Sequence, residues 1–283
     1  MRRLVRALLP TFHYLMQTEV HVFAFSVSAG LLLSFFPFLT VMLSICRYVL
    51  RWRAGVGAVY FALNDYFPDA MGQFIRRNFE VTVASRGPVQ VVSLILLFFT
   101  ASGIFEPLEV ALNRVWNCPK NRNYFKNQLV SLGLIFACGA LMLVSTTLTA
   151  LNKEFLTGIS LRPASPAANI LGLVLFKAAA VPISMLVLFL IYWLLPNCKI
   201  RAARMVPAAI VVGILLELLK YVNLWTWPYL RAKLQSEYGP FYYTVTIILW
   251  GFLAALVVLA GAEWTARRAQ VRVSLGFNHR DST

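Results

Sequence analysis

The chain has 283 residues, of which 59% are hydrophobic and only 13% are charged. A soluble domain carries charge on about a quarter of its residues, so this composition excludes an ordinary soluble enzyme and indicates a single polytopic membrane domain. The net charge of +15 is spread over short stretches between long apolar runs. Basic residues in such positions are typical of the flanks of membrane spans, and they disfavour nucleic acid as a partner.

Six apolar runs follow one another and predict an all-α membrane helix bundle with about six transmembrane helices. The runs are residues 22–46, 89–105, 129–151, 169–195, 205–225 and 242–265. Each has close to the ~20 residues that a helix needs to cross hydrocarbon, and continuous rather than alternating hydrophobicity favours helices over strands. We expect residues 1–269 to form the membrane domain and residues 270–283 to be a disordered cytoplasmic tail.

Short amphipathic helices are predicted between the spans. Residues 56–67 carry apolar side chains at helical spacing, and the same spacing resumes after Pro68 over residues 71–79. Helices that lie on the membrane surface would produce this pattern. Residues 107–117 share it, and Pro107 suits the first position of a helix.

Two prolines are expected to bend spanning helices. Pro37 lies in the first predicted span and Pro182 in the fourth. A proline inside a helix removes a backbone donor and kinks the axis. Comparable kinks in the first and fourth spans are also what a repeat of three plus three helices would show.

The distribution of Lys and Arg predicts the orientation of the bundle. If the N-terminus lies in the cytoplasm, the inner segments carry more basic residues than the outer loops, and the two short outer loops carry very few. We therefore expect cytoplasmic N- and C-termini, with membrane lipids and anionic headgroups at the cytoplasmic face as partners.

The cysteines predict no metal site. Cys46, Cys118, Cys138 and Cys198 form no CxxC or Cys/His cluster. Cys118 and Cys198 fall in loops that the predicted orientation places in the cytoplasm, where disulfides are rare. We expect four isolated thiols and no cofactor.

Ionisable side chains inside the spans are the main candidates for a substrate-binding site, because exposing one to lipid costs about 3 kcal/mol or more. Lys177 lies in the fourth predicted span, and Glu217 and Lys220 share one face of the fifth. Glu263 ends the sixth, where it could also face headgroups. Two interpretations remain open: an ion pair that fixes helix register, or groups that line a polar cavity and contact a substrate.

Signals of catalysis are few. His13, His21 and His279 are scattered near the two ends of the chain, and no HxH or HExxH occurs. GxGxxG, Walker A and nucleophile-elbow patterns are absent from the sequence as well. We therefore predict that the protein is not an enzyme and has no catalytic residues.

Several short segments occur in a characteristic order. They are Leu-Ser-Phe-Phe-Pro at 33–37, Ala-Leu-Asn-Arg-Val-Trp at 111–116, Leu-Pro-Asn-Cys-Lys at 195–199, Glu-Leu-Leu-Lys-Tyr at 217–221, Tyr-Gly at 238–239 and Gly-Ala-Glu at 261–263. Together they resemble the YihY/BrkB family of bacterial inner-membrane proteins over residues 20–265. The resemblance implies six spanning helices in the cytoplasmic membrane but no agreed activity, since a ribonuclease label is regarded as mistaken and the other label is an association with virulence. Asn113 and Arg114, in the second segment, join the substrate-binding candidates.

The function that these features favour is a transporter or export factor for an anionic or amphiphilic molecule such as a lipid. The alternative is a non-transporting membrane scaffold or envelope- and virulence-associated factor, and a membrane-bound hydrolase is a distant third. The sequence leaves the substrate, the coupling ion and a homo-oligomeric state open.

Overall fold

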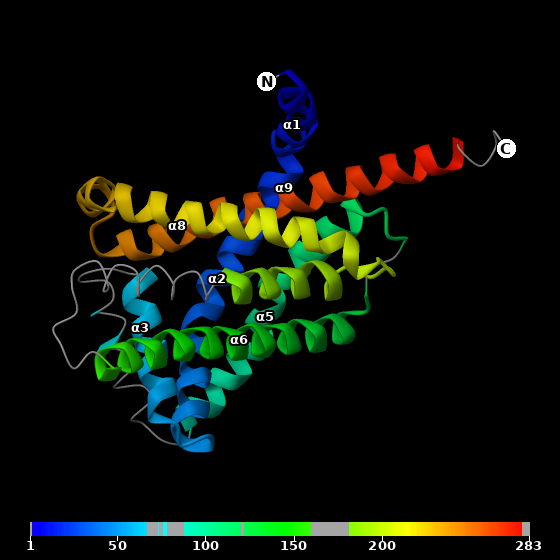
Figure 1. The fold of residues 1–283 in the computed structure, drawn as a ribbon. Helices are drawn as coiled ribbons and strands as arrows, with labels where there is room; N and C mark the ends of the chain where they lie inside the picture. The colour runs from blue at the N-terminus through cyan, green and yellow to red at the C-terminus, as the bar shows by residue number, and fades with distance from the viewer. Residues whose placement is uncertain are drawn as a thin grey trace. The chain divides into compact units, whose positions relative to one another are not determined.

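The computed structural model describes residues 2–66, 73, 76–77, 88–119, 122–159 and 181–278, and Figure 1 shows their helices. These residues contain no strand, which confirms the predicted all-α class. Among the described residues, four apolar helical stretches are long enough to cross a membrane: Thr18–Val49, Val91–Val115, Tyr124–Ser145 and Ala202–Arg268. Their apolar composition, like that of the predicted runs, places them in the hydrocarbon of a bilayer.

The predicted spans fall on these helices. The first three runs coincide largely with Thr18–Val49, Val91–Val115 and Tyr124–Ser145, and the last two both lie within Ala202–Arg268. The fourth run is described only from residue 181, where Val181–Leu194 forms a shorter apolar helix that includes Pro182.

The chain divides into two compact units. The first comprises Met1–Leu32, Thr100–Ser131 and Leu188–Thr283, and the second comprises Leu33–Phe99 and Leu132–Val187. Three long helices contribute residues to both units: α2 (Thr18–Ser44), α5 (Pro88–Val115) and α6 (Tyr124–Ile159).

The first unit is built on two long helices of the C-terminal part of the chain. Helix α8 (Ala202–Tyr238) and helix α9 (Tyr242–Asn278) lie side by side and are joined by the 3-10 turn Gly239–Phe241 (Figure 1). Gly239 has a φ of 53°, a backbone region that favours glycine. The two helices approach closely, because a Cβ on Gly261 would overlap the side chain of Val212.

Helices α2 and α5 also meet through glycine in the first unit. A Cβ on Gly30 would overlap the backbone carbonyl of Gly103, whereas a Cβ on Gly103 would lie 3.4 Å from the Cα of Gly30. On the other side of α2, a Cβ on Gly251 of α9 would lie 3.2 Å from the Cβ of Ser28. Small residues therefore let α2 pack against both neighbours, as is common where helices associate in membranes.

The second unit contains α3 (Arg53–Tyr66) and the π-helical turn Ile45–Val49. Helix α3 confirms the predicted helix at residues 56–67, and it buries Val59 and Leu63. The predicted continuation at residues 71–79 lies largely outside the described residues. In this unit, Gly139 of α6 allows close contact with Met42 and Phe38.

Two helix boundaries correct the predictions. We expected a separate helix to begin at Pro107, but Pro107 lies inside α5, which continues to Val115. A proline can kink a helix without ending it. Helix α5 continues past Pro107 because the residues that follow it pack into the core, where Leu108 and Leu112 are almost completely buried. We also expected disorder from residue 270, but α9 continues to Asn278. Extending an existing helix fixes one residue per hydrogen bond and avoids the cost of nucleation.

Helix α1 (Arg2–Leu15) is an element that the sequence analysis missed. In the sequence, its basic residues indicate the orientation of the bundle in the membrane but do not predict a helix. Leu9, Phe12 and Met16 are all about 60% exposed, and they recur at helical spacing. This pattern is the one that could have revealed the helix.

Candidate functional site

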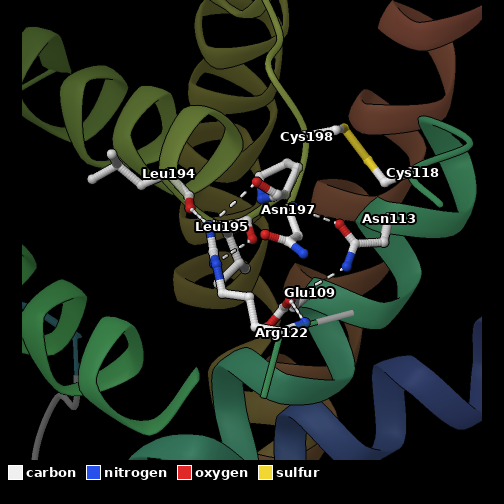
Figure 2. Close-up of a disulfide and its surroundings, with 9 residues drawn as sticks. Glu109, Asn113, Cys118, Arg122, Leu194, Leu195, Asn197 and Cys198 are labelled. Carbon is white, nitrogen blue, oxygen red and sulfur yellow. Dashed lines mark hydrogen bonds between the residues drawn. A yellow bond between two sulfur atoms is a disulfide. The ribbon is translucent and has the colours of Figure 1, made fainter. Parts of the chain in front are cut away.

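A buried polar cluster lies where α5 ends and α6 begins, next to the segment that leads into α8 (Figure 2). We call it the Glu109 cluster, and it comprises Glu109, Asn113, Arg122 and Asn197. Glu109 and Asn113 are four residues apart on α5, so they share a helix face, and they are only 1% and 3% exposed. The Nδ2 group of Asn113 donates a hydrogen bond to Oε1 of Glu109 at 3.3 Å.

Arg122 connects this face of α5 to the end of the Val181–Leu194 helix. Its backbone N–H donates to Oε1 of Glu109 at 3.2 Å. Its guanidinium donates to the carbonyl oxygens of Leu195 and Leu194, both at 2.8 Å, and to that of Pro196 at 3.3 Å (Figure 2). Carbonyls at the C-terminal end of a helix have no partner within the helix, and a cation there also complements the helix dipole.

Asn113 provides a second connection between the same segments. Its Oδ1 accepts a hydrogen bond from the backbone N–H of Asn197 at 2.7 Å, and its carbonyl oxygen accepts one from the N–H of Cys118 at 2.8 Å. The turn after α5 includes Asn117 with a φ of 52°, a conformation that asparagine tolerates better than most residues. The side chain and the backbone of Asn113 therefore hold both loops in place.

A disulfide between Cys118 and Cys198 joins these two loops covalently (Figure 2). The expectation of four isolated thiols was therefore wrong for this pair, while Cys46 and Cys138 are free. The two cysteines are 80 residues apart in the sequence but have Cα atoms 5.6 Å apart. Their spacing in the sequence forms no motif that could have predicted the pair. In the structure, the hydrogen bonds of Asn113 and Arg122 join the same two loops.

Several polar atoms on α5 and α6 are buried without a hydrogen-bond partner among the described residues. They are Oε2 of Glu109, Oδ1 of Asn127, both side-chain polar atoms of Gln128, and Oγ of Ser131. Glu109 belongs to the membrane-spanning stretch of α5, and the other three belong to that of α6. A buried polar group without a partner costs about 1–3 kcal/mol, so these groups do not stabilise the fold through the contacts described.

A separate polar contact joins α1 to the middle of α9. The hydroxyl of Thr11 donates to Oε2 of Glu263 at 2.6 Å and accepts from Nη2 of Arg267 at 2.8 Å. Arg267 also forms an ion pair with Glu263, with Nε and Oε1 3.2 Å apart. Burial, together with the nearby carboxylate of Glu263, raises the pKa of Tyr14 to about 12.

The structure distributes the predicted substrate-binding residues over several places. Asn113 lies in the Glu109 cluster, and Glu263 lies in the contact between α1 and α9. Arg114 is exposed and forms an ion pair with Glu19. Glu217 and Lys220 are half-buried on α8, whereas Lys177 lies outside the described residues.

Glu109, Arg122 and Gln128 were missed, and the predicted span boundary explains the first of them. The second span was predicted to end at residue 105, which placed Glu109 in the predicted surface helix at residues 107–117, but the apolar stretch continues to Val115. With a boundary one helical turn later, Glu109 becomes an intramembrane carboxylate, the type of residue that marks a candidate site. Arg122 and Gln128 carry no comparable signal.

Comparison with known proteins identifies the family. The model of the family described as "Virulence factor BrkB" matches residues 11–281. Similar proteins named "UPF0761 membrane protein" occur in Chlorobium chlorochromatii (26% identical over 250 residues, 88% of this chain and 56% of the relative), Vibrio vulnificus strain YJ016 (26% over 248 residues, 83% and 73%) and Photobacterium profundum (27% over 260 residues, 87% and 76%).

The chain spans only 56% and 57% of the length of the relatives from Chlorobium chlorochromatii and Chlorobium limicola. No solved structure matches it. The family match nevertheless covers every helix of the Glu109 cluster and confirms the resemblance seen in the sequence. This integral membrane protein therefore belongs to the BrkB virulence factor family.

Proposed function

We propose that the protein is a transporter or export factor for an anionic or amphiphilic molecule, such as a lipid with a charged headgroup. The observation that carries this proposal is the set of buried polar atoms on α5 and α6 that have no hydrogen-bond partner within the described part of the chain. Hydrocarbon offers no hydrogen bonds to replace the missing partners. Groups of this kind in membrane helices are costly, and they commonly mark the path of a polar solute.

The two oxygens of the Glu109 carboxylate differ in their hydrogen bonding. Its Oε1 accepts hydrogen bonds from Asn113 and from the backbone of Arg122, whereas Oε2 has no partner among the described residues. The N–H groups of the Arg122 guanidinium donate to the carbonyls of residues 194–196, so they are not used on Oε2 of Glu109. A purely structural carboxylate would be expected to have both oxygens satisfied.

An anionic or amphiphilic substrate fits the surroundings of the cluster. Lys126 is exposed on the first turn of α6, where it would attract a negatively charged headgroup. Arg114, on the last turn of α5, is also exposed but is paired with Glu19. With both termini in the cytoplasm, as the basic residues predict, this end of the helices faces the anionic inner leaflet. The acyl part of an amphiphile would remain in the lipid while its headgroup passes the polar side chains.

A flux assay with the purified protein in liposomes tests the proposal. Candidate substrates are fluorescent short-chain lipids with anionic headgroups and a panel of small organic anions. Glu109→Gln keeps the shape of the side chain but removes its charge, and we expect flux to fall at least tenfold. The matched control is Glu106→Gln, the same change one turn earlier on α5 at an exposed position, and it should transport like the wild type.

The outcomes separate the proposal from its alternative. Equal flux in Glu109→Gln and Glu106→Gln would remove the Glu109 cluster from the pathway. No flux with any substrate in the panel, by a protein that is folded and monodisperse, would refute transport and favour the scaffold. The ion-pair interpretation of Glu217 and Lys220 is tested with Glu217→Gln and Lys220→Met, singly and together. If each single variant loses function and the double variant folds and regains it, the pair has a structural role.

A further inference from the structure

We propose that Cys118 and Cys198 form a reversible thiol–disulfide site whose redox partner is a cytoplasmic dithiol, and that its state controls how firmly the two loops of the Glu109 cluster are held together. The site lies on the loop between α5 and α6 and on the segment between residue 194 and α8. The redox state would act on these two loops whether or not the protein transports a substrate.

The position of the disulfide makes exchange possible. Both cysteines are half-buried and lie outside the helices, so exchange at the disulfide need not unfold a helix. The other two cysteines differ, because Cys46 is completely buried and Cys138 lies within the spanning part of α6. Thiol exchange requires access of the attacking thiolate to a sulfur, and among the described residues only the Cys118–Cys198 pair combines access with a partner sulfur.

The surroundings indicate that the loops stay close when the disulfide is reduced. Noncovalent contacts cross the same junction: the N–H of Asn197 donates to Asn113, and the guanidinium of Arg122 donates to three carbonyls. Reduction would therefore leave both thiols near each other and ready to reoxidise. The loops would be held by hydrogen bonds alone, which open locally at lower cost than a covalent link.

The predicted orientation favours exchange over a permanent link. The residues that flank both loops are rich in Lys and Arg, which favours a cytoplasmic location for this face. Cytoplasmic thiols are kept reduced by dithiol proteins and glutathione, and disulfides that form there are usually transient.

The exchange is balanced as a two-electron step. A thiolate of the dithiol attacks one sulfur of the pair, forms a mixed disulfide and releases the other cysteine as a thiolate that takes up a proton. The second thiol of the reductant then attacks the mixed disulfide, which releases the second cysteine and leaves the reductant as a disulfide. The reverse reaction with an oxidised dithiol restores the link.

Thiol counting in native membranes tests the site. Membranes that hold the full chain are equilibrated with mixtures of reduced and oxidised dithiothreitol, quenched with acid, denatured and labelled with a maleimide polymer that shifts the gel band. With four cysteines and one disulfide, we expect two labels under oxidising conditions and four under reducing conditions, in one reversible transition. Cys118→Ser and Cys198→Ser should each show three labels throughout.

Two results of this assay would overturn the proposal. A disulfide that resists excess dithiothreitol until the protein is denatured would be a permanent structural link. Four labels at every ratio would mean that the pair does not form. In cells labelled directly, we expect four labels during normal growth and two after brief treatment with diamide, and a pair that is oxidised in untreated cells would contradict the cytoplasmic exchange.

Hydrogen exchange tests the effect on the loops. In the reduced protein we expect backbone exchange over residues 116–119 and 195–201 to rise several-fold, while the α8–α9 turn at Gly239 serves as an unchanged reference. The double variant Cys118→Ser/Cys198→Ser should show the reduced pattern under all conditions. Equal exchange in both redox states would refute control of the loops by the disulfide.

Discussion

Replacing Arg122 with methionine is the sharpest test of how the Glu109 cluster is held together. Methionine keeps most of the length of the side chain but removes the donors to the carbonyls of Leu194, Leu195 and Pro196. Hydrogen bonds from a charged group contribute about 1.5–3 kcal/mol each. The bond to Pro196 is long, and the one to Leu194 is exposed, so only the bond to the buried Leu195 counts in full.

We therefore expect Arg122→Met to lower the free energy of unfolding by about 3 kcal/mol, since the carbonyl of Leu195 loses its partner where water has little access. Arg122→Lys should lose about half as much, because an ammonium keeps the charge at the helix end but cannot match the planar fork of the guanidinium. The assay is unfolding by SDS titration in mixed micelles, followed by circular dichroism.

Arg114→Met is the matched control, eight residues earlier on the adjoining helix. Arg114 also forms an ion pair, with Glu19, but both side chains are about 60% exposed. Exposed pairs of this kind contribute about 0–1 kcal/mol. If Arg122→Met is no more destabilising than Arg114→Met, the guanidinium does not hold the end of the Val181–Leu194 helix and the reasoning fails.

Three further predictions concern the packing of the first unit. Gly30→Ala should prevent stable folding while Gly103→Ala is tolerated, because only the first Cβ overlaps backbone; equal yields of monodisperse protein for the two variants would contradict this. Thr11→Val should speed tryptic removal of α1 several-fold, since the hydroxyl is hydrogen-bonded to Glu263, and Thr11→Ser should restore wild-type rates. Because the pKa of Tyr14 is raised to about 12 in the folded protein, the unfolded chain loses this proton at a lower pH, and the free energy of unfolding should decline as the pH rises from about 10 to about 12. The free energy of unfolding of Tyr14→Phe should decline less over that window. An identical decline in the variant and the wild type would refute the assignment.

The features that the sequence determined are those that depend on a short stretch of chain. A run of about 20 apolar residues identifies a spanning helix wherever it occurs, so most of the predicted spans coincide with apolar helices of the structure. The helical spacing at residues 56–67 likewise predicted α3. Local signals predicted the ends of helices less well. Pro107 suggested the start of a helix, yet α5 continues past it because the residues that follow pack into the core.

The candidate site depended on contacts that no local pattern encodes. Asn113 was predicted as a site residue because of its family segment. Its partner Asn197 lies in another of these segments but was not predicted as a site residue. Glu109 was not predicted either, because the second span was ended too early. Glu217 and Lys220 were chosen because charge is costly in lipid, and their role stays a prediction.

The chain itself fixed the membrane environment, the helical class and the approximate position of most spans, since hydrophobicity and helical period are properties of neighbouring residues. Tertiary structure alone decided that residues 84 and 73 positions apart in sequence, Asn113 with Asn197 and Arg122 with Leu195, hydrogen-bond to each other. It also decided that Cys118 pairs with Cys198. The physical reason is that such pairs form only where the path of the helices returns two distant loops to the same place.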